Sequence, residues 1–187
     1  MAKTDSPQVD ILAEDNRLVS FCLKIVMKLG IQKIRKKITV EPVPKSGAGF
    51  TWLYREYPGL VRKHRARATK TSVAFVIGVD SDKKSPEERA ADLDKKLEEA
   101  KLEKRKGDEA IVFVIPKRNI ETWIMYFGGA KVDETTDYKN KVGKKPDIEK
   151  AANGFVEEYR KYIKKPDNFS TLSSLVATYV ELGRVLA

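Results

Sequence analysis

Two aspartates, two residues apart at the end of an apolar run, are the strongest candidates in this sequence for binding a metal ion. Asp80 and Asp82 follow the run V-A-F-V-I-G-V at positions 73–79. Hard divalent cations such as Mg²⁺ or Mn²⁺ take oxygen ligands, and carboxylates near a strand end can converge on one ion. Aspartate also favours turns and helix N-termini, so the pair could instead begin the next helix. The pattern therefore predicts either a metal site or a turn.

Two further acids follow apolar runs. Glu14 comes directly after V-D-I-L-A, and Glu121 comes shortly after A-I-V-F-V-I. If these runs are parallel strands, their carboxyl ends share one edge of a sheet, where ligands bind. Clustered carboxylates repel one another, and one or two Mg²⁺ ions would relieve that repulsion and assist phosphodiester cleavage. We expect Glu14, Asp80 and Asp82 to be catalytic metal ligands. Glu121 could be a fourth ligand or a charge at a helix N-terminus.

Basic residues lie beside these acids. Lys83, Lys117 and Arg118 could hold a scissile phosphate, and we count Lys83 among the catalytic residues. A second basic segment ends a predicted helix and is expected to contact nucleic acid. Its main cations are Arg62, Lys63, Arg65 and Arg67. The chain has 37 Lys and Arg against 27 Asp and Glu, a formal net charge of +10, which favours binding to nucleic acid but could also serve solubility alone.

Apolar runs and amphipathic segments alternate along the chain, which predicts an α/β fold. We expect strands near 9–13, 38–43, 73–79 and 110–115. We expect helices near 18–29, 50–66, 85–107, 119–127, 148–162 and 172–186. Right-handed crossovers would make a mostly parallel four-stranded sheet flanked by helices. Residues 1–129 would form this domain, and residues 130–187 would add a polar loop and C-terminal helices packed on it.

Several local signals mark where elements begin, bend and end. The residues S-P-E-E at 85–88 predict a helix start with a capping box, and Gly107 predicts the end of that helix. The pair P-G at 58–59 lies inside the predicted helix 50–66 and predicts that this helix is bent or interrupted there. The residues K-S-G-A-G at 45–49 predict a flexible loop. The lysine-rich loop 130–146 is long enough to be functional.

An ordered set of landmarks resembles the Toprim fold of topoisomerases, primases and the overcoming-lysogenization-defect nucleases. The landmarks are Glu14 after the first strand, D-x-D at 80–82 after a later one, and the α/β alternation between them. More narrowly, A-E-D-N-R-L-V-S-F, G-A-G and R-N-I-E-T-W-I-M resemble a group of small stand-alone Toprim-like proteins. The match covers about residues 9–127.

The resemblance implies roles for the same acids. Glu14 would be a general acid or base or a metal ligand, and Asp80 and Asp82 would bind Mg²⁺. It also implies a nuclease or related phosphodiester-processing enzyme of a prokaryotic defence system or mobile element. The usual Toprim pattern has glycine directly after the glutamate and often an acid further on, whereas this chain has Asp15 and Leu18 there.

Segment 11–30 is also similar to the opening of a response-regulator receiver domain. In that family an acidic pair after the first strand holds Mg²⁺ beside a phosphorylatable aspartate. Asp80 lies 66 positions after Glu14, which is further than the receiver pattern places that aspartate. The threonine and Lys-Pro landmarks of receivers have no clear counterpart here, so this remains the lesser alternative.

A non-enzymatic nucleic-acid-binding protein is the alternative of a different class. Its phosphate contacts would be the basic segment named above and the lysines of the polar loop, Lys139, Lys141, Lys144 and Lys145. Trp52, Tyr54 and Tyr57 could stack on bases, although aromatic residues of an amphipathic helix more often belong to the core. Such a protein would tolerate the loss of Asp80 and Asp82, and a nuclease would not.

Composition also bounds the cellular setting. There is no run of about 18 apolar residues to span a bilayer, and the first ten residues lack the apolar segment of a signal peptide. We therefore expect a cytoplasmic protein without membrane contact, acting alone, as a homodimer or with a partner protein. Cys22 lies in an apolar helical pattern and is expected in the core. A Cys/His zinc site is excluded because the chain has one Cys and one His.

Overall fold

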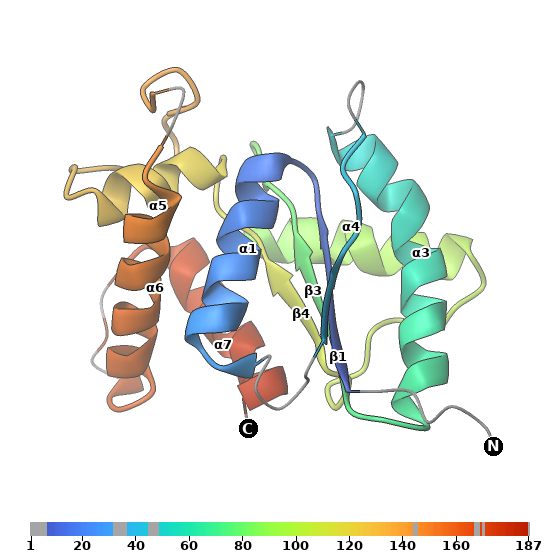
Figure 1. Ribbon diagram of the computed structural model, residues 1–187. Helices are drawn as coiled ribbons and strands as arrows, with labels where there is room; N and C mark the ends of the chain where they lie inside the picture. The colour runs from blue at the N-terminus through green and yellow to red at the C-terminus, as the bar shows by residue number, and fades with distance from the viewer. Residues whose placement is uncertain are drawn as a thin grey trace.

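The structure is a computed structural model that describes residues 7–31, 37–44, 49–143, 146–166, 169 and 171–186 (Figure 1). Its strands are β1 (Gln8–Ala13), β2 (Lys37–Val40), β3 (Val73–Gly78) and β4 (Ile111–Val114). Its helices are α1 (Asn16–Lys28), α3 (Gly49–Ala68), α4 (Pro86–Glu99), α5 (Ile120–Phe127), α6 (Ile148–Tyr162) and α7 (Ser173–Leu186). The predicted α/β class is confirmed. Within the described ranges, no helix is long and apolar enough to cross a membrane.

The four strands form one parallel sheet in the order β2-β1-β3-β4. The central strand β1 pairs on both sides, with Gln8 opposite Lys37 of β2 and Val73 of β3. The chain leaves β1 towards β2 and then returns across the sheet to β3. In an open α/β sheet, a crevice forms at the carboxyl edge where neighbouring connections diverge in this way. That point lies between β1 and β3, the strands that precede Glu14 and Asp80.

Helices cover both faces of the sheet. One face packs against α1, α5, α6 and α7, and the other packs against α3 and α4 (Figure 1). Alternate residues of β1 separate accordingly, because Ile11 points to the first face and Leu12 to the second. All six residues of β3 are buried, as expected for a central strand covered on both faces.

The start of α1 gives Asp15 and Leu18 structural roles. Asp15 is the N-cap of α1, and its carboxylate accepts a hydrogen bond from Leu18 N–H at 2.9 Å. Leu18, in the first turn of α1, is fully buried. Helix and sheet approach closely here, because a Cβ on Gly78 would lie 3.0 Å from Cys22 Sγ. Cys22 is buried as predicted, and burial raises the pKa of its thiol to about 12.

The predicted capping box of α4 is confirmed, but its predicted end at Gly107 is wrong. Ser85 Oγ accepts from Glu88 N–H, while the Glu88 carboxylate accepts from Ser85 N–H. The helix ends at Glu99 in a Schellman motif, in which Lys101 takes a φ of +58° and Leu102 N–H donates to the carbonyl of Leu97. The sequence does not predict this helix end, because the left-handed position that glycine usually occupies is here Lys101.

Pro58 lies inside α3, which continues through it as one helix. Figure 1 shows α3 changing direction along its length, in keeping with the predicted bend, because a proline removes one helical hydrogen bond and crowds the preceding turn. The predicted flexible loop at 45–49 falls outside the described residues except for Gly49. The same holds for Lys144 and Lys145.

The C-terminal helices belong to the same core as the sheet. Phe155 of α6 and Tyr179 of α7 pack in the cluster that contains Ile11 and Val112. The outer edge of β4 is covered from α7, because Phe113 N–H donates to the Glu181 carboxylate at 3.1 Å. The polar loop before α6 is fastened to α7 through Glu134, whose carboxylate accepts from the first backbone N–H groups of that helix.

Two helix glycines provide a matched test of this packing. A Cβ on Gly154 of α6 would lie 2.5 Å from the Phe127 ring, whereas a Cβ on exposed Gly183 of α7 would meet nothing within 4 Å. Overpacking costs about 1–3 kcal/mol, and replacing glycine by alanine in a helix gains roughly 0.5–1 kcal/mol. We expect Gly154→Ala to lower the free energy of unfolding in urea and Gly183→Ala to raise it. Equal effects of the two substitutions would contradict the packing of α5 on α6.

Candidate functional site

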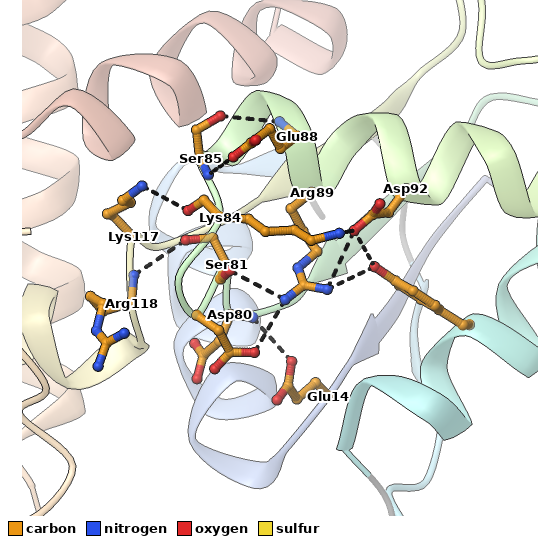
Figure 2. Close-up of polar contacts among 12 residues, drawn as sticks. Glu14, Asp80, Ser81, Lys84, Ser85, Glu88, Arg89, Asp92, Lys117 and Arg118 are labelled. Carbon is orange, nitrogen blue, oxygen red and sulfur yellow. Dashed lines mark hydrogen bonds and ion pairs between the residues drawn. The ribbon is translucent and has the colours of Figure 1, made fainter. Parts of the chain in front are cut away.

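Glu14 and Asp80 meet at the carboxyl edge of the sheet. They lie at the point where the chain leaves β1 towards one side of the sheet and β3 towards the other. The backbone continues the β1–β3 ladder, with Glu14 N–H donating to the Gly78 carbonyl at 3.0 Å. The Asp80 N–H then donates to Glu14 Oε2 at 3.1 Å, so the Glu14 side chain reaches across to the neighbouring strand end (Figure 2). The structure thus brings together two of the four acids at the predicted place.

Asp80 is almost fully buried, with 1% of its surface exposed. Its Oδ1 accepts from Ile120 N–H at 3.0 Å, at the first residue of α5. Among the described residues its Oδ2 has no hydrogen-bond partner, and the nearest cation is Lys139 Nζ at 3.9 Å. Burial, followed by the nearby Glu14 carboxylate, raises the pKa of Asp80 well above its usual range.

Glu14 also holds its proton more tightly than an exposed glutamate does. Desolvation raises its pKa to about 7, although the Asp80 N–H works in the opposite direction. The carboxylates of Asp82 and Asp15 raise it further. A carboxyl group that titrates near neutral pH can give or accept a proton during a reaction.

Asp82 and Glu121 lie close to this pair but are bound to arginines. Asp82 Oδ2 accepts from the Arg89 guanidinium at 3.1 Å. Glu121, with 2% of its surface exposed, pairs with Arg17, and its Oε2 has no hydrogen-bond partner. Within the part of the chain that is described, no three Asp, Glu, His or Cys side chains are grouped so that they could hold a metal ion. The predicted set of four ligands is therefore not assembled in this conformation.

The basic residues beside the acids have different surroundings. Lys117 Nζ donates to the Lys84 carbonyl at 2.8 Å, which ties two loops of the carboxyl edge together (Figure 2). Arg118 N–H donates to Ser81 Oγ at 3.2 Å, and its guanidinium lies 3.8 Å from Asp137. Lys83 lines the cavity described next. Lys83 and Arg118 are therefore better placed than Lys117 to meet a bound phosphate.

A cavity of about 720 Å³ lies beside Asp82, between the start of α3, the β3–α4 loop and α4. Four acidic residues line it, Asp82, Asp92, Glu99 and Asp137. Six basic residues line it, Lys83, Lys84, Arg89, Lys95, Lys96 and Arg118. The excess of positive charge suits an anionic ligand.

The predicted nucleic-acid-binding segment of α3 lies at the opposite edge of the sheet. Because α3 connects the end of β2 to the start of β3, its basic end lies near the beginnings of the strands. Arg65 pairs there with Glu109, and Arg67 pairs with Asp10. Arg62 and Lys63 are exposed. The structure therefore does not bring these four cations to the acids, and their contact with nucleic acid remains a separate prediction.

Several residues that shape the site carry no recognisable signal in the sequence. Arg17, Arg89 and the pairing of Lys139 with Asp80 were not foreseen, because a lone basic residue in a helix or loop carries no signal of its partner. Of the three aromatic residues proposed to stack on bases, Trp52 and Tyr57 are buried in the core, which excludes that role for them. Tyr54 is half-buried and hydrogen-bonded to Arg89, and the exposed ring belongs to Phe50.

The fold and site define a doubly wound α/β domain with a buried aspartate, Asp80, and a half-buried glutamate, Glu14, together at its carboxyl edge. Comparison of the chain with protein-family models, with curated proteins and with solved structures gives no match. The resemblance to the Toprim fold therefore remains a prediction.

The raised pKa of Glu14 predicts a pH-dependent stability. Its folded-state pKa of about 7 lies above the ordinary 4.5, so its contribution to stability is complete below pH 4.5 and is lost as the pH rises through 7. A shift of this size corresponds to about 3 kcal/mol. We expect the free energy of unfolding to fall between pH 5 and pH 8, and to fall less in Glu14→Gln.

Urea unfolding at the two pH values measures this difference. Glu157→Gln, which changes an exposed carboxyl group on α6, is the control and should keep the wild-type slope. A Glu14→Gln variant with the full wild-type pH dependence would contradict the assignment.

Proposed function

We propose that this chain is a Mg²⁺- or Mn²⁺-dependent nuclease, or a related enzyme that processes phosphodiesters of DNA or RNA. The observation that carries the proposal is the contact between Glu14 and Asp80 at the point where the connections diverge, where no described residue gives Asp80 Oδ2 a hydrogen bond. A buried acceptor of this kind is costly unless something completes it. A divalent cation with oxygen ligands would do so.

The residues present fit a cation that the substrate helps to hold. Mg²⁺ commonly uses one or two protein carboxylates and takes its remaining ligands from water and substrate phosphates. Glu14 and Asp80 would supply the carboxylates, and Asp82 could join them if Arg89 released it. A cation held there would activate water for attack and offset charge on the leaving oxygen. The proposal therefore does not require three carboxylates to be grouped together in the free protein.

The chain's own residues have distinct roles in this proposal. Glu14 accepts a hydrogen bond from Asp80 N–H and would hold the cation together with Asp80. Lys83 and Arg118 hold the phosphate from the side of the cavity. Lys139 balances the buried acids while no substrate is bound. Glu121 is paired with Arg17, so it would add negative charge near the cation without contacting it directly.

The burial of Asp80 favours this proposal over a receiver-like one. A phosphorylated aspartate must offer an oxygen to its phosphate donor, and Asp80 exposes 1% of its surface. Its Oδ1 is also occupied by Ile120 N–H. A cation that reaches Asp80 alongside Glu14 needs less space than a phosphoryl group on the Asp80 side chain.

A non-enzymatic nucleic-acid-binding protein is the second candidate. The observation in its favour is that three of the four acids already have a cation of their own. Arg17 pairs with Glu121, Arg89 with Asp82, and Lys139 with Asp80. The acids would then form a neutralised structural cluster, and binding would depend on the basic surface alone.

Calorimetric titration of Mg²⁺ in the presence of a short DNA oligonucleotide separates the two candidates. The titration is made at pH 8, because metal ligands must be deprotonated. We expect wild type to bind Mg²⁺ and Asp80→Asn to bind it at least roughly tenfold more weakly, a loss that even outer partners of a metal can cause. Glu157→Gln is the matched control. Equal Mg²⁺ binding by wild type and a folded Asp80→Asn protein would overturn the proposal.

Lys139 provides an independent test, because its ammonium group and a bound cation would compete for Asp80. Unit charges about 4 Å apart in water interact by about 1 kcal/mol, so Lys139→Met should tighten Mg²⁺ binding on the order of fivefold. Lys141→Met is the control, since Lys141 lies over the Tyr138 ring in the same loop. Weaker Mg²⁺ binding by Lys139→Met would show that Lys139 supports the site instead of competing for it.

A further inference from the structure

We propose that the cavity beside Asp82 binds one unstacked nucleotide unit of a single-stranded nucleic acid. Its base would stack on Phe50, and its phosphate would be held by Arg89, Arg118 and Lys83. This inference rests on the proposed function, because it names the class of substrate that the same edge of the sheet would receive. It is tested by binding alone, without a metal ion.

The cavity has the size and position that this ligand needs. Its volume of about 720 Å³ falls within the range of about 300–1,000 Å³ typical of small-ligand sites. Asp82 lies in its wall, two residues from Asp80, so a strand that placed one nucleotide here would bring a neighbouring phosphodiester towards the acids. A duplex does not fit this description, because its bases are stacked and paired inside the helix.

Buried polar atoms without partners point to a ligand in this cavity. Arg89 exposes 5% of its surface and is held by the Tyr54 hydroxyl at 2.9 Å, by the Ser81 carbonyl and by the carboxylates of Asp82 and Asp92. Its Nε has no partner among the described residues, and neither has the buried Nε of Arg118. Two guanidinium groups with spare donors in one wall suit the oxygens of a phosphate.

Asn119 adds an acceptor to these donors. Its amide nitrogen donates to Asp137 at 2.9 Å, while its Oδ1 is buried and accepts from no residue that the structure describes. A nucleotide carries N–H and O–H groups as well as phosphate oxygens, whereas inorganic phosphate at neutral pH offers mainly acceptors. The combination of spare donors and a spare acceptor therefore favours a nucleotide.

An exposed aromatic ring completes the site. Phe50 exposes 44% of its surface although it is a large apolar residue. It lies edge-to-face against Tyr54 with ring centroids 5.6 Å apart, and the Arg89 guanidinium lies 5.6 Å from its centroid. A ring held by an aromatic neighbour beside cationic side chains is the usual platform for bases of single strands.

The backbone of the cavity wall is strained where it meets the acids. Asp82 and Arg118 face each other in an isolated antiparallel bridge and have φ values of +53° and +65°. Such conformations are uncommon for residues other than glycine, and they persist only where the surrounding structure holds them in place. Here the bridge fixes Arg118 and Asp82 in the wall of one cavity.

Fluorescence anisotropy with labelled oligonucleotides, measured in EDTA at low salt, tests the inference. We expect wild type to bind a single-stranded oligonucleotide more tightly than the matching duplex. Phe50→Ala should weaken single-strand binding about tenfold, within the range seen for loss of a stacking aromatic residue. Lys83→Glu should weaken it by a similar factor of about five to ten and reduce its salt dependence.

Matched controls separate the cavity from general charge and apolar surface. Val180→Ala removes another exposed apolar side chain, on α7, and Lys161→Glu makes the same charge change on an exposed part of α6. Both should stay within about twofold of wild type under these salt conditions. Equal weakening by Lys83→Glu and Lys161→Glu, unchanged binding by Phe50→Ala, or tighter binding of the duplex would each overturn the inference.

Competition identifies the source of the nucleotide. Displacement of the labelled strand by a 5′-mononucleotide would assign the cavity to a nucleotide as such, and displacement by unlabelled oligonucleotide alone would assign it to a strand. Both results support a nucleotide site. Because EDTA removes divalent cations, single-strand binding that depends on Phe50 would stand even if Mg²⁺ binding at Asp80 failed, so the two proposals can fail separately.

Discussion

The enclosure of two acids at neighbouring strand ends, Asp80 buried and Glu14 half-buried, is the constraint on which the carboxyl edge of this protein depends. Glu14 and Asp80 follow adjacent parallel strands, so the pairing of β1 with β3 forces their backbones together. Desolvation opposes the ionisation of both carboxyl groups. Nearby charges add to it, from Glu14 at Asp80 and from Asp82 and Asp15 at Glu14, so both pKa values are raised. The surrounding cations and the N-terminus of α5 offset part of this cost. A bound divalent cation would offset more of it, and this cost is the physical basis of the proposed activity.

Much of the fold could be predicted from local patterns. The buried run of β3, the capping box at Ser85 and the spacing of the acids after strands are all signals within a few residues, and parallel strands then bring their carboxyl ends to one edge. The Schellman ending of α4 could not be predicted, because Lys101 adopts a conformation that usually marks glycine. Local preference gives way there to the hydrogen bonds that close the helix.

The acids of the candidate site were predictable from the sequence, but the cations that pair with them were not. Glu121 and Arg17 are 104 residues apart in sequence, and no periodicity connects them. Lys139 lies in a loop whose position depends on how Glu134 fastens it to α7. These pairings come from tertiary packing, and they change how a ligand could bind at the site. The acids are balanced within the free protein, so substrate or metal must compete with internal ion pairs. Phe50 was overlooked for a similar reason, because its exposure depends on how α3 packs.

Crystals of the protein grown with Mn²⁺ and a single-stranded phosphorothioate oligonucleotide would test the central claim most directly, through the anomalous signal of manganese. We predict a Mn²⁺ ion that contacts the carboxylates of Glu14 and Asp80 and an oxygen of the bound strand, with Lys139 displaced from Asp80. A bound strand without manganese at this edge, and with Lys139 still beside Asp80, would contradict the metal-dependent account and favour a protein that only binds nucleic acid.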